Sequence, residues 1–223
     1  MAIIKGKLIV FSGLDGAGKS TQIQLLMEEL KQRGRKPVYL WTRGGYTPLF
    51  SACKTFLRLA LKRKLPPPGR SEKREKAFRK VWVRKLWLVL SILDLILVYG
   101  VYIRVSRVFG RIVIADRYVW DTWIDFNLGF PEAYVDRWIT WKILKRVSPR
   151  PDLTFLLVIP VKEALIRSRK KNEPFPDSED TLKKRREIYT NQSHKAKYVM
   201  PDCLQPVKEV QKTILKNVSE ILD

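Results

Sequence analysis

The sequence predicts an α/β protein in which a mostly parallel sheet of five strands is flanked by helices on both faces, giving three layers. Two observations predict this fold: short apolar runs alternate with segments of helical periodicity, and hydrophobic residues make up 45% of the 223 residues. Such alternation is typical of parallel sheets built from β-α-β units. The apolar share is sufficient for one buried core, so we expect a single domain covering residues 1–223.

Five short apolar segments have the length and flanking residues of strands. The first, at 7–12, is apolar through its centre and is followed by Gly13. A continuous apolar run bounded by a turn residue is typical of a strand buried on both faces. The predicted strands occupy residues 7–12, 37–42, 111–116, 152–159 and 197–200.

Between these segments, apolar residues recur at helical spacing. Ile23, Leu26 and Leu30 lie on one face of a predicted helix, and Gly34 follows its end. Three prolines and a glycine at 66–69 separate two further helical segments. The predicted helices occupy residues 20–33, 48–64, 71–108, 162–171, 181–192 and 207–222.

Residues 86–103 form an apolar run of 18 residues with a single charge, at Asp94. This length is close to what spans a bilayer, but a carboxylate at mid-depth would be costly there. A helix buried on all sides of a soluble domain has the same composition. We therefore expect a core helix, with a membrane span or contact with a membrane surface as the alternatives.

The chain is strongly basic, with 44 Lys and Arg against 22 Asp and Glu and a formal net charge of +22. Residues 54–85 carry 13 of the basic residues and two of the acidic ones. This balance predicts an anionic partner: phosphate-bearing small molecules, nucleic acid or an acidic membrane surface. Cys53 and Cys203 lie far apart and the amino terminus has no signal-like apolar core, so a cytoplasmic setting is expected.

The most specific motif follows the first predicted strand. It is a G-x-x-x-x-G-K-[ST] loop that leads into a helix, and its residues are Gly13, Leu14, Asp15, Gly16, Ala17, Gly18, Lys19 and Ser20, followed by Thr21. Glycines allow backbone N–H groups to surround phosphates, the lysine contacts the outer phosphates, and the Ser20 hydroxyl is a ligand for Mg²⁺. The motif therefore predicts binding of a nucleoside triphosphate with magnesium.

A second motif ends the third predicted strand, where Asp116 is followed by Arg117 and Tyr118. A carboxylate beside a guanidinium at a strand end suits a site where magnesium and a second phosphate meet. The N-K-x-D motif expected of a GTPase is not found in the sequence.

Five blocks in order resemble the thymidylate kinase family of nucleoside monophosphate kinases. They are FSGLDGAGKST, WTRGGYTPL, VIADRY, PDLTFLLVIPVKEALIRSRKK and LKKRREIY. The resemblance runs from end to end of the chain. It implies a P-loop kinase fold with a short lid at about 167–181, and transfer of the terminal phosphoryl group of ATP to a nucleoside monophosphate, dTMP in this family.

The resemblance also implies roles for individual residues. Asp15 would face the sugar and phosphate side of the acceptor, Arg43 would grip its phosphate, and the Asp116–Arg117 pair would serve magnesium and phosphate oxygens. Arginine suits phosphate because its fork makes paired hydrogen bonds. Since Ala17 leaves the loop without an arginine, the lid would supply the catalytic cation. The basic residues of this lid segment are Arg167, Arg169 and Lys171.

The chain departs from the family pattern around the acceptor, at Asp94, Asp121 and Phe126. Asp121 and Asp125 would repel a dianionic acceptor unless a cation or sugar hydroxyls met them. We therefore expect the protein to use dTMP less efficiently than a typical family member, or to prefer a different acceptor, and two alternatives remain. One is a P-loop kinase of another small or lipid-linked acceptor. The other is a membrane- or nucleic-acid-associated P-loop protein that uses residues 54–85. A homodimer is a further expectation.

Overall fold

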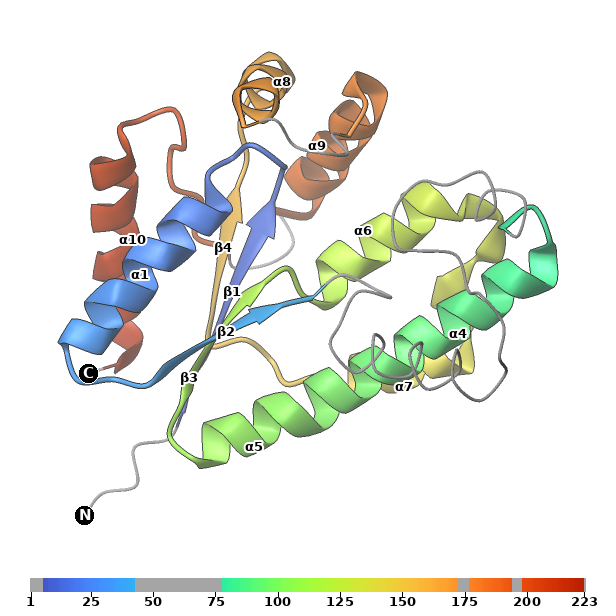
Figure 1. The fold of residues 1–223 in the computed structure, drawn as a ribbon, viewed down its shortest axis with the longest axis horizontal. Helices are drawn as coiled ribbons and strands as arrows, with labels where there is room; N and C mark the ends of the chain where they lie inside the picture. Colours follow the sequence, from blue (N-terminus) through green and yellow to red (C-terminus); the bar gives the residue numbers. More distant parts are fainter. Residues whose placement is uncertain (1–5, 43–77, 172–176, 194–197, 223) are drawn as a thin grey trace, which may run out of the picture.

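Four parallel strands form the centre of the computed structural model, which describes residues 6–42, 78–171, 177–193 and 198–222. The strands are β1 (Leu8–Gly13), β2 (Pro37–Trp41), β3 (Ile112–Asp116) and β4 (Leu153–Leu157), in the order β2-β3-β1-β4 (Figure 1). In this register Phe11 of β1 lies beside Asp116 of β3 and Phe155 of β4. The carboxyl ends of the strands therefore meet at one edge, where α/β proteins bind ligands.

The fifth predicted strand, at 197–200, is reduced to a single bridge. Val199 pairs in parallel with Phe155, with hydrogen bonds from Leu156 N to Val199 O at 2.9 Å and from Val199 N to Thr154 O at 3.0 Å. Pro201 follows directly and has no N–H to extend the ladder. The described part of the chain thus has a sheet of four strands rather than five.

Helices cover both faces of the sheet, and the side chains of β1 alternate between the two resulting cores. Ile9 and Phe11 pack in the core beneath α1 (Lys19–Gln32) and α10 (Val207–Leu222). Leu8 and Val10 pack in the other core, with α4 (Val81–Leu97) and α7 (Ile139–Val147). This two-sided burial is why the strand is apolar throughout. The three predicted layers are confirmed (Figure 1).

The long helix predicted at 71–108 is divided by a π-helical turn. α4 is followed by this turn (η1, Val98–Tyr102) and by α5 (Ile103–Val108). Residues 71–77 and the helix predicted at 48–64 lie outside the described residues. π-Helical turns often occur at functional sites.

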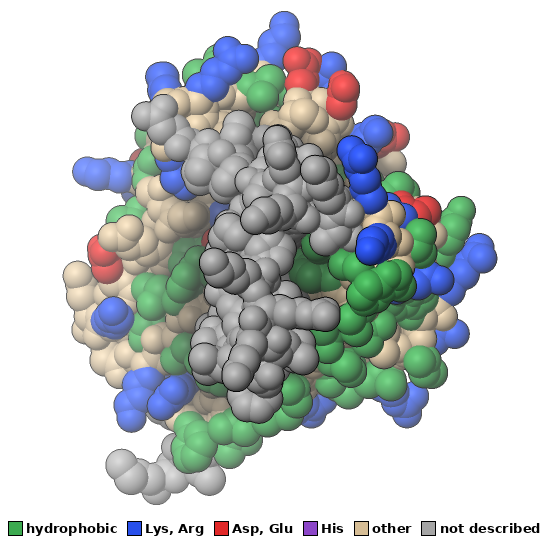
Figure 2. Space-filling view, turned by 45° about the vertical axis from the view of Figure 1, so that its right-hand side comes forward, with side chains coloured by type: hydrophobic (Ala, Val, Ile, Leu, Met, Phe, Trp, Pro, Cys, Tyr) green, Lys and Arg blue, Asp and Glu red, His purple; other side chains and the backbone are tan. Residues whose placement is uncertain are grey.

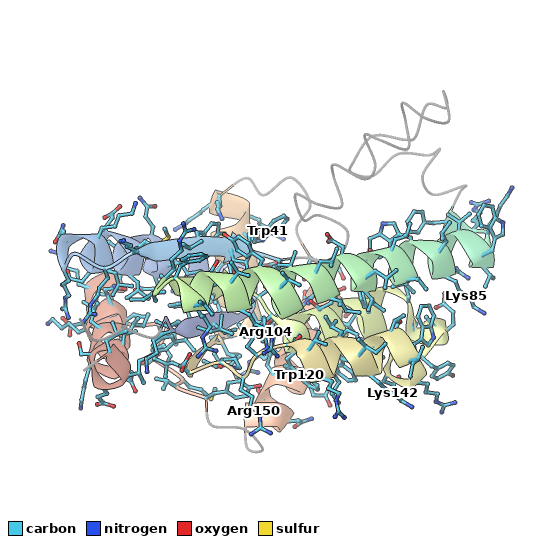
Figure 3. The ribbon with its side chains drawn as sticks, turned by 90° about the horizontal axis from the view of Figure 1, so that it is seen from below. Trp41, Lys85, Arg104, Trp120, Lys142 and Arg150 are labelled. Carbon is cyan, nitrogen blue, oxygen red and sulfur yellow. The ribbon has the colours of Figure 1, made fainter. Side chains whose placement is uncertain are left out.

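One face of the α4–α5 rod is buried and the opposite face is apolar but exposed. Leu88, Ile92 and Ile103 are fully buried against the sheet, as expected of a core helix. The exposed apolar residues include Trp82, Leu86, Leu93, Leu97, Val101 and Val105. Figure 2 shows hydrophobic side chains gathered on this side of the molecule with Lys and Arg around them, and Figure 3 shows Lys85 and Arg104 toward the two ends of the rod.

The rod is also the one described segment that is long and apolar enough to cross a membrane, with a mean hydropathy of 2.3 over its most apolar stretch. Its buried face belongs to the core of the α/β domain. A membrane span would have to give up this packing. The prediction of a core helix is therefore correct for the buried face of the rod and does not account for its exposed apolar face.

The chain between β3 and β4 contains helices whose bounds the sequence pattern did not give. They are α6 (Val119–Gly129), the 3₁₀ turns η2 (Pro131–Ala133) and η3 (Val135–Arg137), and α7. The other helices in the described part of the chain are α8 (Val161–Lys170) and α9 (Glu179–Ser193). Like α1 and α10, these two lie within a few residues of their predicted positions.

Candidate active site

The glycine-rich loop joins β1 to α1 at the carboxyl edge of the sheet. Gly13, Gly16 and Gly18 all have positive φ, at +131°, +79° and +91°. A Cβ at Gly13 would lie 1.9 Å from Leu157 O, and one at Gly16 would lie 2.9 Å from Ala164 O. The loop is thus fitted closely between the end of β4 and α8, and only glycine allows this path.

Gly13→Ala is expected to destabilise the fold by about 3 kcal/mol or more, because backbone strain and a collision with Leu157 O add together. Gly34→Ala is the matched control, since Gly34 has a φ of +69° but open space around its Cβ position. That variant should lose only about 1–2 kcal/mol. Thermal or urea unfolding of both variants measures the difference. Equal losses would show that the close approach at Gly13 is unimportant.

Lys19 begins α1 and is buried beneath the loop. Its Nζ donates to Leu14 O at 2.7 Å and to Gly13 O at 3.1 Å, and it lies 3.8 Å from an Asp15 carboxylate oxygen. Burial, with the Arg117 charge next in importance, lowers the pKa of Lys19 below its usual value. The ammonium thus lies against the loop that would hold the phosphates. Ser20 and Thr21, next in the helix, are exposed.

Arg117 lies opposite the loop, directly after β3. It is 4% exposed and forms an ion pair with Asp15. Its second guanidinium nitrogen, Nη1, is buried and has no hydrogen-bond partner among the described residues. Burial lowers the pKa of Arg117, but Asp15 and Asp125 raise it by more, and the result is well above the usual value. A permanent cation with an unused donor is suited to binding an anion.

The backbone of Arg117 has an unusual conformation and is linked to the π-helical turn by two hydrogen bonds. Its φ is +77°, which is rare outside glycine. Tyr99 of η1 donates to the Thr42 hydroxyl at 2.9 Å, and that hydroxyl donates to Arg117 O at 2.8 Å. Strained residues of this kind gather at functional sites. The π turn is thus connected to the Arg117 backbone through Thr42.

Asp116, the last residue of β3, is 5% exposed and accepts a hydrogen bond from Tyr39 Oη at 3.2 Å. Burial raises the pKa of Asp116, and the charges of Lys19 and Arg117 oppose that change. Asp15, Lys19, Asp116 and Arg117 therefore lie together at one sheet edge.

The carboxylates of Asp121 and Asp125 on α6 have partners within the protein, so the repulsion of a dianionic acceptor expected from the sequence is reduced. The Asp121 carboxylate accepts hydrogen bonds from Ser12 Oγ at 2.7 Å, from Tyr189 Oη at 2.5 Å and from Tyr118 N at 2.9 Å. Asp125 pairs with Arg185 at 2.5 Å. Both carboxylates are neutralised or hydrogen-bonded from within the protein.

The structure describes the basic residues of the expected lid, but not the whole segment at 167–181. Arg167 donates to Glu163 of its own helix at 2.6 Å and to Cys203 O, in the turn before α10, at 3.2 Å. Arg169 and Lys171 are exposed near the end of α8. Arg43 and residues 172–176 lie outside the described residues. Among the described residues, the structure places neither Arg167 nor Arg169 against Lys19.

Sequence reasoning assigned no role to two residues of α9, Arg185 and Tyr189, which reach the site. Their spacing of four residues matches that of Asp121 and Asp125 on α6, and both pairs face inward. The LKKRREIY block contained both residues. Neither that block nor the shared helical spacing reveals which helices pack together.

A strand, a glycine loop and a helix that begins with a buried lysine, facing an arginine at the same sheet edge, define a P-loop phosphotransferase. The family model described as Thymidylate kinase matches residues 98–214. The chain belongs to the thymidylate kinase family and is a nucleoside monophosphate kinase.

Individual relatives extend the match over most of the chain. A probable thymidylate kinase of Thermococcus kodakarensis is 32% identical over 190 residues, which cover 81% of each chain. The thymidylate kinase of Desulfotalea psychrophila is 30% identical over 227 aligned positions, covering 97% of this chain and 96% of the relative. The thymidylate kinase of Plasmodium falciparum is 23% identical over 97% of this chain and 91% of the relative.

Proposed function

We propose that the protein transfers the terminal phosphoryl group of ATP to dTMP, forming ADP and dTDP. The observation that carries this proposal is that Lys19 and Arg117, whose buried Nη1 has no hydrogen-bond partner among the described residues, both contact Asp15 at the carboxyl ends of β1 and β3. Lys19 is suited to the donor phosphates and Arg117 to the acceptor phosphate. An acceptor phosphate oxygen would form the new bond to phosphorus as the bond to the ADP oxygen breaks.

The donor side consists of the glycine loop. Its residues are Gly13, Gly16, Ala17, Gly18, Lys19, Ser20 and Thr21. Their N–H groups and the Lys19 ammonium would hold the β- and γ-phosphates. For Lys19 this requires exchanging the Leu14 and Gly13 carbonyl oxygens for phosphate oxygens. Because phosphoryl transfer depends on positioning and charge neutralisation, these are the groups that the reaction needs.

On the acceptor side, Arg117 would bind the phosphate through Nη1 while Asp15 holds its other nitrogen. Arg43 is proposed as a second phosphate ligand. Arg167 and Arg169 are proposed to supply positive charge at the transferred group, since the loop has Ala17 where an arginine could otherwise stand. These assignments rest on the family resemblance and on the cationic character of the segment.

Magnesium is proposed as the companion of ATP, with Ser20 and Asp116 as its protein ligands. A hydroxyl and a carboxylate are the oxygen donors that Mg²⁺ prefers, and it keeps several waters besides one or two protein ligands. The donor set therefore fits the ion. Bound there, the ion would neutralise charge on the phosphates.

Steady-state kinetics with dTMP as the sole acceptor test the proposal. We expect a kcat/KM of about 10⁴ M⁻¹s⁻¹ or above, the ordinary range for enzymes. The acceptor-side carboxylates that argued against dTMP are satisfied internally, which supports this expectation. ADP release with another nucleoside monophosphate, or with a sugar or lipid-linked acceptor, but not with dTMP would overturn the choice of acceptor and leave the kinase class intact.

The expected partners beyond the substrates stay predictions. A homodimer would cover the exposed apolar face of α4–α5, and an anionic membrane or nucleic-acid surface would suit residues 54–85, of which only 78–85 are described. Light scattering of the purified protein measures the first, and retention on heparin with its salt dependence measures the second. A cytoplasmic location is proposed on the same footing.

A further inference from the structure

The peptide group between Arg117 and Tyr118 is hydrogen-bonded on both sides by buried side chains. Its carbonyl oxygen, Arg117 O, accepts from the Thr42 hydroxyl at 2.8 Å. Its N–H, which belongs to Tyr118, donates to an Asp121 carboxylate oxygen at 2.9 Å. The preceding N–H, that of Arg117, donates to Phe11 O at 2.9 Å. The peptide planes before and after the Cα of Arg117 are therefore both fixed.

These hydrogen bonds surround a strained backbone. A φ of +77° is unfavourable for a residue with a Cβ, and such a conformation persists only where the surrounding structure holds it. Because φ and ψ set the direction of the Cα–Cβ bond, they also determine where the guanidinium can reach. With this backbone Arg117 pairs with Asp15, and its buried Nη1 has no hydrogen-bond partner among the described residues.

Asp121 is itself held by two further elements. Its carboxylate accepts from Ser12 Oγ at 2.7 Å and from Tyr189 Oη at 2.5 Å, and the side chain is fully buried. Ser12 lies in β1 directly before Gly13, and Tyr189 belongs to α9. The carboxylate that holds the Tyr118 N–H is thus fixed from the strand before the glycine loop and from α9.

Thr42 is held in a comparable way on the carbonyl side. Tyr99 of the π-helical turn donates to the Thr42 hydroxyl at 2.9 Å, and both residues are fully buried. A hydroxyl has one hydrogen to donate. Because the Thr42 oxygen accepts from Tyr99, its own hydrogen is directed to Arg117 O.

We propose that Asp121 and Thr42 are positioning residues for acceptor binding: together they hold the Arg117–Tyr118 peptide in the orientation that directs the Arg117 guanidinium to the acceptor phosphate. This inference rests on the proposed function of Arg117 as an acceptor ligand. It makes a prediction that a purely structural role does not make. Loss of either hydrogen bond weakens acceptor binding and spares ATP binding, and a replacement that keeps the hydrogen bond spares both.

Asp121→Ala is expected to raise the KM for dTMP about tenfold or more, the size of effect typical of a lost hydrogen bond to a charged group. The KM for ATP should change less than about twofold. Asp121→Asn keeps an oxygen that can accept from the Tyr118 N–H, so its dTMP KM should stay within about threefold of wild type. Val218→Ala, a buried change in α10, is the control for lost stability and should leave both constants unchanged.

Thr42→Val and Thr42→Ser make the same test on the carbonyl side. Valine has nearly the shape of threonine but cannot donate to Arg117 O, so the dTMP KM should rise about fivefold, as for a lost neutral hydrogen bond. Serine keeps the donor and should behave as wild type. Circular dichroism and thermal unfolding identify a variant that does not fold, and if Asp121→Ala does not fold, the Thr42 pair decides.

An unchanged dTMP KM in folded Asp121→Ala or Thr42→Val overturns the inference. So does an equal rise in the KM values for dTMP and ATP. The inference is also wrong if Asp121→Asn is as impaired as Asp121→Ala, or if Thr42→Ser is as impaired as Thr42→Val.

Nuclear magnetic resonance separates this inference from the proposed function, because it reports the guanidinium without any substrate. The Nε–Hε resonance of Arg117, assigned by its loss in Arg117→Lys, should shift in Thr42→Val and stay in place in Thr42→Ser; neither change alters a charge. A wild type that is active only with another acceptor overturns the choice of dTMP, and the same KM series is then measured with that acceptor. A wild type that is inactive with every acceptor overturns the proposed function, and the resonance alone then decides the inference. An active wild type with an unmoved resonance in Thr42→Val overturns the inference alone.

Discussion

Lys19→Ala is expected to lower kcat by about 10³-fold or more while the protein remains folded. The ammonium is buried against two carbonyl oxygens of the loop, and removing such a charge from a phosphoryl-transfer site typically costs several orders of magnitude. The fold should tolerate the change because the glycine loop is shaped by its own backbone and its contacts to Leu157 and Ala164. The variant loses two hydrogen bonds, to Leu14 O and Gly13 O, and an ion-pair contact with Asp15 at 3.8 Å.

Single-turnover and steady-state assays with ATP and dTMP measure the loss, and thermal unfolding measures stability. The expected destabilisation is about 1–2 kcal/mol, or a few degrees in Tm. Lys31→Ala, an exposed lysine in the last turn of the same helix, is the matched control and should behave as wild type. Turnover by Lys19→Ala near the wild-type rate would remove the kinase assignment of this loop.

The contrast between Lys19 and Arg185 shows which parts of the site the sequence could predict. The loop around Lys19 is local: strand, glycines and helix follow one another within one short segment, and the chemistry requires those residue types in that order. The Asp116–Arg117 pair was found for the same reason, at the end of an apolar run. In each case a short stretch of chain carries the whole signal.

Arg185 and Tyr189 contribute through contacts with residues 60 or more positions earlier in the chain. The sequence shows their helical spacing, but the packing of α9 on α6 depends on the whole fold. In a chain with 44 basic residues, one buried arginine cannot be told from a solvated one by sequence. For the same reason the charge of Asp121 and Asp125 was read as repulsive, since their internal partners were not yet known.

The secondary structure, too, was predictable where the signal is local and not where it depends on distant contacts. The strands β1 and β3 are buried on both faces, so their apolar runs are unambiguous. The fifth strand was overestimated because its end is set by Pro201 and by its position beside β4, and only one bridge forms. In α4 the exposed face is as apolar as the buried one, so the composition could not separate a core helix from a helix with an unpartnered surface.

Arg117→Lys is expected to reduce kcat/KM for the acceptor by about 10²–10³-fold, with the KM for ATP changed much less. A lysine keeps the charge opposite Asp15 but cannot pair with Asp15 and present a second donor to phosphate at once. Because the charge is retained, the buried site is not left with an uncompensated carboxylate, and the fold should survive with a lowered Tm. Arg111→Lys, an exposed change just before the same strand, is the control.

The comparison is made by varying dTMP at saturating ATP and then ATP at saturating dTMP. If the ATP constant changes as much as the acceptor constant, Arg117 serves the donor phosphates instead, and the two sides of the site have been assigned in the wrong order.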